Sequence, residues 1–160
     1  MTLFIALLLA SGPSAVSQGA PKIRWMTYRS DALHARITVP AAWVANKSAQ
    51  ALAFHSPGDL EIRVGVGLMR SAYEGTIEDA ADALAATEGL EGWSRRFRQV
   101  AGLRAMEVVG HPKDNPKMKM ARYFIATPSG PYLLQCVAPE KAWPLYRHIF
   151  EAIINSLRFV

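Results

Sequence analysis

Residues 118–138 read MKMARYFIATPSGPYLLQCVA, and this stretch decides the fold. Its two apolar runs, Met118 to Ala126 and Tyr132 to Ala138, are separated by Thr127-Pro-Ser-Gly130. Proline and glycine between two runs of apolar and aromatic residues are typical of a turn between strands. We therefore predict two antiparallel strands here, as part of a larger sheet.

Six more segments, all N-terminal to this pair, are predicted to be strands, most of them from an alternation of apolar and polar residues. They are Ile23–Tyr28, Leu33–Val39, Ala51–Phe54, Glu61–Met69, Ser94–Val100 and Arg104–Val109. The last two, together with the pair above, predict an antiparallel meander. In the fourth segment Gly65 and Gly67 share a face, which predicts a close approach by an element packed over it.

The first predicted helix begins after Thr76, whose hydroxyl can accept a hydrogen bond from the amide of Asp79 as an N-cap. Gly89 or Gly92 can end this helix. Its apolar face is rich in alanine and consists of Ile77, Ala80, Ala81, Leu84 and Ala85. We therefore expect the helix to lie close against the sheet, over the glycine face.

A second helix is predicted over about residues 140–156, with Pro144 in its first turn, where a missing amide is tolerated. Apolar residues three and four apart form a stripe that we expect to be buried on the sheet: Ala142, Leu145, Tyr146, Ile149, Phe150, Ile153 and Leu157.

Strands on both sides of one internal helix, followed by a meander and a terminal helix, predict an α+β fold. In this fold a mostly antiparallel β-sheet has helices packed on its faces. The chain has neither βαβ alternation nor a glycine-rich turn from a strand into a helix. A Rossmann-type nucleotide site is therefore not expected.

Several short motifs are arranged along the chain as they are in one known superfamily. These are Val39-Pro-Ala-Ala-Trp43, Phe54-His-Ser-Pro57, a turn containing Ser71, Gly102-Leu-Arg-Ala105, Trp143 and Ser156-Leu-Arg-Phe159. On these motifs, about residues 33–160 resemble the PsbP/DcrB-like α/β/α sandwich superfamily. These motifs can serve structural roles: Pro40 can end a strand, Trp43 can fold back as a large apolar cap, and Phe159 can return the chain to the sheet after the helix.

The resemblance implies a binding or assembly module rather than an enzyme. Members of the superfamily include photosystem extrinsic subunits, a Ran-binding transport factor, envelope lipoproteins and chaperones of secreted effectors. They are typically non-catalytic, and their partners differ. The resemblance therefore implies a protein partner without choosing it, and no motif here matches a particular partner-binding site.

The first twenty residues have the features of an export signal. Leu3 to Ala10 is an uninterrupted apolar run, and Ser11 to Ala20 is small and weakly polar. Small residues three apart allow cleavage after Ser17 or after Gly19. We therefore predict a signal peptide over residues 1–19 and a single domain over residues 20–160, which places the mature protein in the periplasm or outside the cell.

No lysine or arginine precedes the apolar run, so either the true start lies upstream or the signal is atypical. A buried N-terminal helix and an uncleaved anchor are the alternatives to export. The run is too short to cross a bilayer, which takes about 20 residues, and no transmembrane span is expected in the mature chain. Leu9-Ala-Ser-Gly12 resembles the start of a lipoprotein box. Pro13 stands where the lipidated cysteine would be, which excludes lipid anchoring at this site.

The formal net charge of +5 lies entirely after Ala20. A basic surface favours acidic partners, but dispersed charge also serves solubility alone. Nucleic acid is not the expected partner. The single cysteine, Cys136, falls within a strand next to Leu134 on the same face and is predicted to be a buried core thiol, with a reactive or intermolecular role as the alternative.

No cofactor, metal or catalytic site is predicted from the motifs. His34, His55, His111 and His148 occur singly, without the spacing of a metal site. His111 and Asp114 share a loop and could bind a cation weakly, but Lys113 and Lys117 would oppose it. The chain has no Gly-x-Ser-x-Gly motif, so a hydrolase would need a triad assembled in space.

Basic residues in the predicted meander form the candidate partner-binding patch. They are Arg95, Arg96, Arg98, Lys113, Lys117 and Lys119, with Trp93 and Phe97 as aromatic neighbours. If the strands pair, these cations could meet a phosphate or an acidic protein. Alternation sends Arg95 and Arg96 to opposite faces, so the alternative is an ordinary charged edge that resists pairing.

These observations together predict an exported, non-catalytic module that binds a protein partner in the cell envelope. One alternative is a carrier of a small ligand or lipid that uses a groove between the sheet and the terminal helix. A third hypothesis is a cryptic hydrolase.

Overall fold

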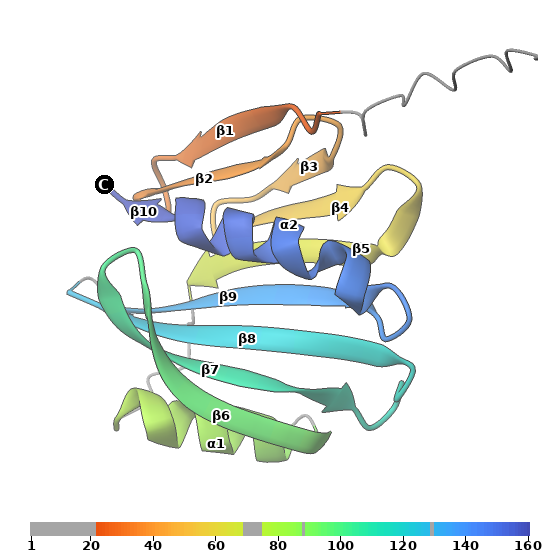
Figure 1. Cartoon of the computed structure of the whole chain (residues 1–160). Coiled ribbons are helices and arrows are strands. Elements are labelled where there is room, and N and C mark those ends of the chain that lie inside the picture. The colour runs from red at the N-terminus through yellow and green to blue at the C-terminus, as the bar shows by residue number, and fades with distance from the viewer. Residues whose placement is uncertain (1–21, 69–74, 88, 129) are drawn as a thin grey trace, which may run out of the picture.

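The structure is a computed structural model that describes residues 22–68, 75–87, 89–128 and 130–160. The predicted signal peptide and the turn around Ser71 lie outside the described residues. The described part contains two sheets and two helices (Figure 1).

The larger sheet confirms the predicted meander and has seven antiparallel strands. In spatial order they are β3 (Val44–Lys47), β4 (Ala51–Ser56), β5 (Asp59–Leu68), β9 (Gly130–Pro139), β8 (Met118–Thr127), β7 (Leu103–Pro112) and β6 (Leu90–Val100). The 118–138 stretch is the predicted hairpin, closed where Thr127 pairs with Gly130. Strand β5 pairs with β9, which joins the N-terminal strands to the meander.

A second, three-stranded sheet corrects the expectation of a single sheet. Its order is β1 (Trp25–Ser30), β2 (Ala35–Pro40) and β10 (Arg158–Phe159). Pro40 ends β2, and the amide of Trp43 donates to its carbonyl at 2.9 Å in the turn that follows. This turn leads into β3, a four-residue strand that was not predicted because it is too short to show alternation. The return of Phe159 to a sheet is confirmed.

Helix α1 (Ile77–Thr87) has the predicted N-cap. The amide of Asp79 donates to Oγ1 of Thr76 at 3.2 Å, and the amide of Thr76 donates to Oδ2 of Asp79 at 3.0 Å. The Thr76 amide and hydroxyl together hold the pKa of the Asp79 carboxyl below its usual value. This reciprocal pair satisfies donors that the first helical turn leaves open.

Helix α1 packs over β6, β7 and β8, not over the glycine face. Its buried alanines lie against a row of larger side chains from those strands, among them Met106, Val108, Met120 and Phe124. The close approach at Gly67 comes instead from the main chain before β4, because a Cβ there would lie 3.1 Å from the carbonyl oxygen of Gln50.

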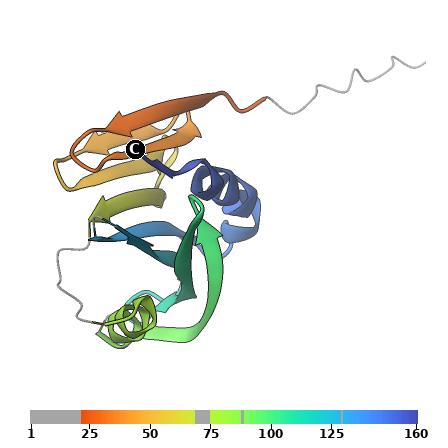
Figure 2. The ribbon, with the colours of Figure 1, turned by 90° about the vertical axis from the view of Figure 1, so that its left-hand side faces the viewer.

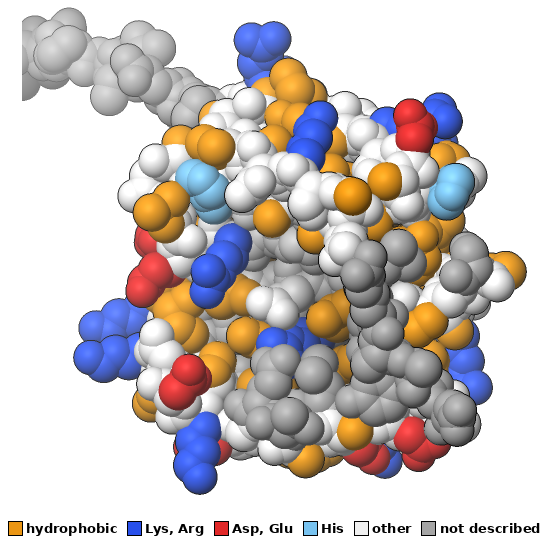
Figure 3. Space-filling view, turned by 180° about the vertical axis from the view of Figure 1, so that it is seen from behind, with side chains coloured by type: hydrophobic (Ala, Val, Ile, Leu, Met, Phe, Trp, Pro, Cys, Tyr) orange, Lys and Arg blue, Asp and Glu red, His pale blue; other side chains and the backbone are white. Residues whose placement is uncertain are grey.

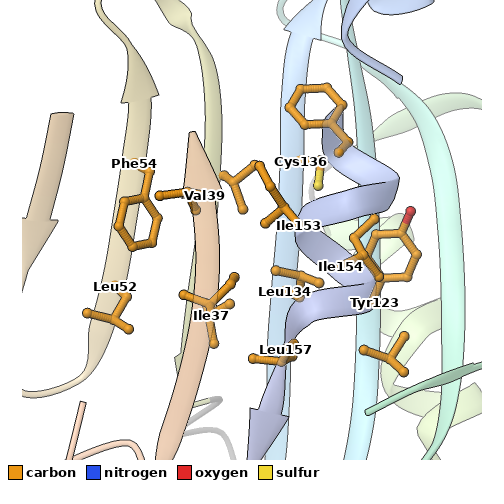
Figure 4. Close-up of a cluster of buried hydrophobic side chains, with 14 of the residues drawn as sticks. Ile37, Val39, Leu52, Phe54, Tyr123, Leu134, Cys136, Ile153, Ile154 and Leu157 are labelled. Atoms are coloured by element: carbon orange, nitrogen blue, oxygen red, sulfur yellow. The ribbon is translucent and has the colours of Figure 1, made fainter. Parts of the chain in front are cut away.

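Helix α2 (Trp143–Ser156) lies on the opposite face of the large sheet, beside the small sheet (Figures 1 and 2). The main core lies between the large sheet on one side and α2 with the small sheet on the other. Side chains of β2, β4, β8, β9 and α2 meet in it (Figure 4). The helix begins three residues later than predicted, because the amide of Ala142 donates to the carbonyl of Pro139 in a turn. Leu145 was predicted to be buried but is 70% exposed.

Ser156, at the end of α2, supplies β2 with a hydrogen-bond acceptor where no strand among the described residues does so. Its Oγ accepts from the amide of Thr38 at 2.9 Å and donates to the carbonyl of Ile153 at 2.6 Å. Replacing Ser156 with alanine leaves the partly buried Thr38 amide without this acceptor. We expect the free energy of unfolding to fall by about 1–2 kcal/mol in urea denaturation.

Asn155→Ala is the matched control, because Asn155 is the exposed preceding residue of the same helix. It is expected to change the free energy of unfolding by no more than about 0.5 kcal/mol. Equal losses in the two variants would assign the effect to the helix end rather than to the hydrogen bond with β2.

Candidate functional site

A groove with a cavity volume of about 520 Å³ lies between α2 and strands β6 to β9. Figure 2 shows β6 curving toward α2, and side chains of both elements line the groove. We call this the α2 groove, and the residues that matter for its chemistry are Arg96, Glu107, Lys119, Trp143, Arg147 and Glu151.

The cavity exists because a row of small and medium side chains crosses the sheet beneath the helix. Ser94 pairs with Val109, Val109 with Ala121, and Ala121 with Cys136, and all four residues line the groove. Directly paired residues on neighbouring strands project to the same face. Because none of the four is large, this row leaves space under α2.

An ion-pair network borders the groove, through Arg96, Glu107 and Glu151, and joins β6, β7 and α2. The Arg98 guanidinium donates to both carboxylate oxygens of Glu151, at 3.2 and 3.0 Å, and to Glu107 at 3.2 Å. Glu107 also accepts from Nε of Arg96. The Arg98 guanidinium lies 5.2 Å from the centroid of the Tyr123 ring. This network holds the middle of α2 to the edge strand β6.

Hydrogen bonds stabilise the ionised forms of the buried and half-buried groups in this network, Glu107 and Arg98. Burial raises the pKa of the Glu107 carboxyl, but donation from Arg96, Tyr123 and Arg98 outweighs burial and leaves the pKa below its usual value. The bond to Glu151 raises the pKa of Arg98. Burial, with the nearby Glu107 carboxylate as a smaller cause, raises the pKa of the Tyr123 hydroxyl. Glu107 is therefore charged, and Tyr123 a neutral donor, at neutral pH.

The rim of the groove carries cations with unused donors. Among the described residues, Arg147 on α2 is exposed and has no ion-pair partner. Lys119 on β8 lies 3.7 Å from a carboxylate oxygen of Glu140 and 5.8 Å from the Trp143 ring. The side chain of Arg96 is 66% exposed. Three elements thus place positive charge around one hollow.

Comparison with known proteins identifies the fold. No protein-family model matches the chain, and no curated protein matches its sequence. Among solved structures, PsbP (CyanoP) from Synechocystis sp. PCC 6803 aligns over 93% of this chain and 100% of its own, with a TM-score of 0.63 and 12% identity. The chain has a PsbP-like fold. This confirms, at the level of the fold, the resemblance drawn from the short motifs.

Two further structures share the PsbP-like fold. LpqN, described as involved in cell envelope biogenesis of Mycobacterium tuberculosis, aligns with a TM-score of 0.51 and 13% identity over 88% of this chain and 86% of its own. PA94 of Pseudomonas aeruginosa, a protein of unknown function, aligns with a TM-score of 0.51 and 15% identity over 82% and 94%. At such identities the likeness concerns the fold alone.

The PsbP-like fold separates the six cations of the predicted patch. Arg96, Arg98 and Lys119 belong to the α2 side of the sheet. Arg95 also borders the α2 groove, but its guanidinium is directed to the other face of the sheet, where it pairs with Asp82 of α1. Lys113 and Lys117 lie in the turn between β7 and β8 and are exposed, the former beside Gly89. On the face seen from behind, lysine and arginine side chains lie in several separate places (Figure 3).

Sequence reasoning missed the acidic members of the groove. Glu107 alternates with Ala105 and Val109 on one strand face, so a carboxylate on the core side of a strand was the available signal. Glu151 and Arg147 lie outside the apolar stripe predicted for the second helix, so no local pattern showed that they would line a groove opposite charged residues of β6 and β7. Tyr123 gave no signal, because an aromatic residue in a strand is usually core.

The hydrolase hypothesis needs a serine or cysteine that is hydrogen-bonded to a histidine. Among the hydrogen bonds of the described residues no such pair occurs: His55 and His111 contact main-chain carbonyls, and His111 also lies 3.5 Å from a carboxylate oxygen of Glu140. Cys136 is fully buried, as predicted, and burial raises the pKa of its thiol, which disfavours the reactive thiolate. Within the same residues, no group of three histidine, cysteine, aspartate or glutamate side chains could hold a metal ion.

Proposed function

We propose that this PsbP-like chain is a non-catalytic module of the cell envelope that binds a protein partner in the α2 groove. The observation that carries the proposal is the arrangement of three cations from β6, β8 and α2 around an open hollow of about 520 Å³. Charges placed around a surface hollow can meet the opposite charges of a protein partner, steer its approach and fix its register. The similarity in fold to LpqN, described as involved in cell envelope biogenesis, supports the compartment.

Export is part of this proposal. The predicted signal peptide over residues 1–19 would deliver the domain of residues 20–160 to the periplasm or the cell exterior. No helix among the described residues is long and apolar enough to span a membrane. The mature domain would then meet its partner in the envelope through its own surface.

A pull-down from envelope extract tests the proposal, with the domain tagged at Val160. We expect one partner to be recovered reproducibly at low salt. The double variant Lys119→Ala/Arg147→Ala should recover at least about tenfold less, because rim charges guide and hold an acidic surface. Recovery by the wild type should also fall at moderate salt, since salt screens exposed charges.

Arg36→Ala/Arg63→Ala is the matched control, because it removes two exposed cations that do not line the α2 groove. It should recover the partner at the wild-type level. Full recovery by the Lys119/Arg147 variant would contradict the assignment of the groove. Turnover of any substrate by the purified domain would contradict the proposal that the module is non-catalytic.

A second candidate function, a carrier of a small apolar ligand, is favoured by another groove. It has a volume of about 600 Å³ and lies between α2 and the chain around the small sheet. Its lining is mainly apolar and includes Ile23, Trp43, Tyr146 and Ile149, with Lys22 and Arg24 also present. A ligand that co-purifies and is visible by native mass spectrometry would support this function, and its loss in a Tyr146→Ala variant would place it here.

A further inference from the structure

Strand β6 is an edge of the large sheet and forms one wall of the α2 groove. It pairs with β7 on one side, and no described strand pairs with its other side. It is 11 residues long, and residues 91–97 are all exposed. A long edge strand presents unpaired amides and carbonyls that can pair with another chain.

The side chains of β6 alternate between two chemical settings. Ser94 and Arg96 line the α2 groove, and Arg98 joins the ion-pair network that borders it. Arg95 and Phe97 face the α1 side, where Arg95 pairs with Asp82 and the guanidinium of Arg104 lies 3.9 Å from the Phe97 ring centroid. An extended segment paired with β6 would therefore place every second side chain beside the groove.

The charges next to this edge favour an acidic segment. Arg96 uses Nε for Glu107, so its two terminal nitrogens remain available. Arg147 and Lys119 lie across the groove, while the carboxylates of Glu107 and Glu151 are already engaged by Arg98. A carboxylate opposite Arg96 would gain a charge-assisted bond, whereas a second copy of β6 would bring arginine against arginine.

We propose that β6 receives an extended acidic segment of a protein partner as an added strand, with alternate carboxylates directed to Arg96 and the cations of the α2 groove. This inference deepens the proposed function and rests on it. Main-chain pairing supplies the affinity, and the cations select the sequence. The arginines that discourage self-pairing thus choose the partner.

The probe is the peptide acetyl-Thr-Glu-Val-Glu-Thr-Glu-Val-Glu-Thr-amide, titrated into the isotope-labelled domain and followed by amide NMR shifts. We expect changes in Ser94 to Arg98 and in the groove, and none in β3, the other edge of the sheet. Methylating alternate peptide nitrogens should weaken binding at least about fivefold, because it removes donors to β6. Replacing the glutamates with lysine should abolish binding.

Variants separate the two elements of the site. Lys119→Ala/Arg147→Ala should weaken the acidic peptide about tenfold, and Arg36→Ala/Arg63→Ala should not. If N-methylation of the peptide leaves its affinity unchanged, the peptide does not bind as an added strand, and the groove is a simple anion-binding site. Shifts elsewhere, or none at about 2 mM peptide, would overturn the inference. The two proposals can fail separately. If recovery of the envelope partner still requires Lys119 and Arg147 but the peptide does not bind, the proposed function stands and only strand addition is wrong.

Discussion

Replacing Phe150 with alanine is expected to lower the free energy of unfolding by about 3–5 kcal/mol, as measured by urea denaturation. Phe150 is 2% exposed and lies among three aromatic side chains. Its ring centroid is 6.4 Å from that of Trp43, 5.3 Å from Trp143 and 6.3 Å from Tyr146. Truncation removes one of the two aromatic contacts between α2 and Trp43, in the turn after β2, and leaves the contact between Trp43 and Tyr146. It also enlarges the α2 groove, because Phe150 lines it.

Phe124→Ala is the control for this prediction. Phe124 is equally buried but belongs to the core under α1, on the other face of the sheet. We expect a similar loss of stability, about 3–5 kcal/mol, with partner recovery unchanged where both variants are folded. A loss below about 1 kcal/mol for Phe150→Ala would show that α2 does not depend on this aromatic cluster.

Replacing Glu107 with glutamine is expected to lower the free energy of unfolding at pH 7 by about 2–3 kcal/mol. Glu107 is 4% exposed and accepts from Arg96, Arg98 and Tyr123. Glutamine keeps the shape but removes the negative charge, so two guanidinium groups lose a charged acceptor. Urea denaturation over a range of pH measures the effect.

The pH dependence of this difference follows from the lowered pKa of Glu107 in the folded protein. A lowered pKa contributes stability that is fully present above the unfolded value, about 4.3, and is lost as the pH falls through the folded value. The gap between the wild type and Glu107→Gln should therefore be constant near neutrality and shrink in acid. Glu91→Gln, at an exposed carboxylate of β6, should show almost no gap. A gap that stays constant to low pH would contradict a charged Glu107.

Much of the fold could be predicted from local sequence. Alternation and turn residues located eight strands to within a few residues, because a strand half buried on one face needs a period of two. Thr76 and Asp79 predicted the start of α1 through a contact three residues apart. In contrast, β3 was missed, and the start of α2 was placed too early, since the turn at Ala142 depends on where the preceding strand ends.

The candidate site was less predictable than the fold. The alternation of β6 correctly predicted that Arg95 and Arg96 lie on opposite faces of the strand. It could not show that Arg95 would pair with Asp82 and Arg96 with Glu107. Pairing across strands joins residues that are distant in sequence, and the Arg98–Glu151 contact spans 53 positions. No local pattern carries information at that range.

The sequence by itself determined the fold class, the antiparallel meander, the N-cap of α1 and the burial of Cys136, because these follow from periodicity and from contacts between near neighbours. Only the tertiary structure decided the split into two sheets, the position of α1 over β6 to β8, and the α2 groove. The groove arises where a row of small side chains on four strands passes beneath a helix from the end of the chain. Such a hollow depends on which distant segments pack together, and packing is settled by the whole chain at once.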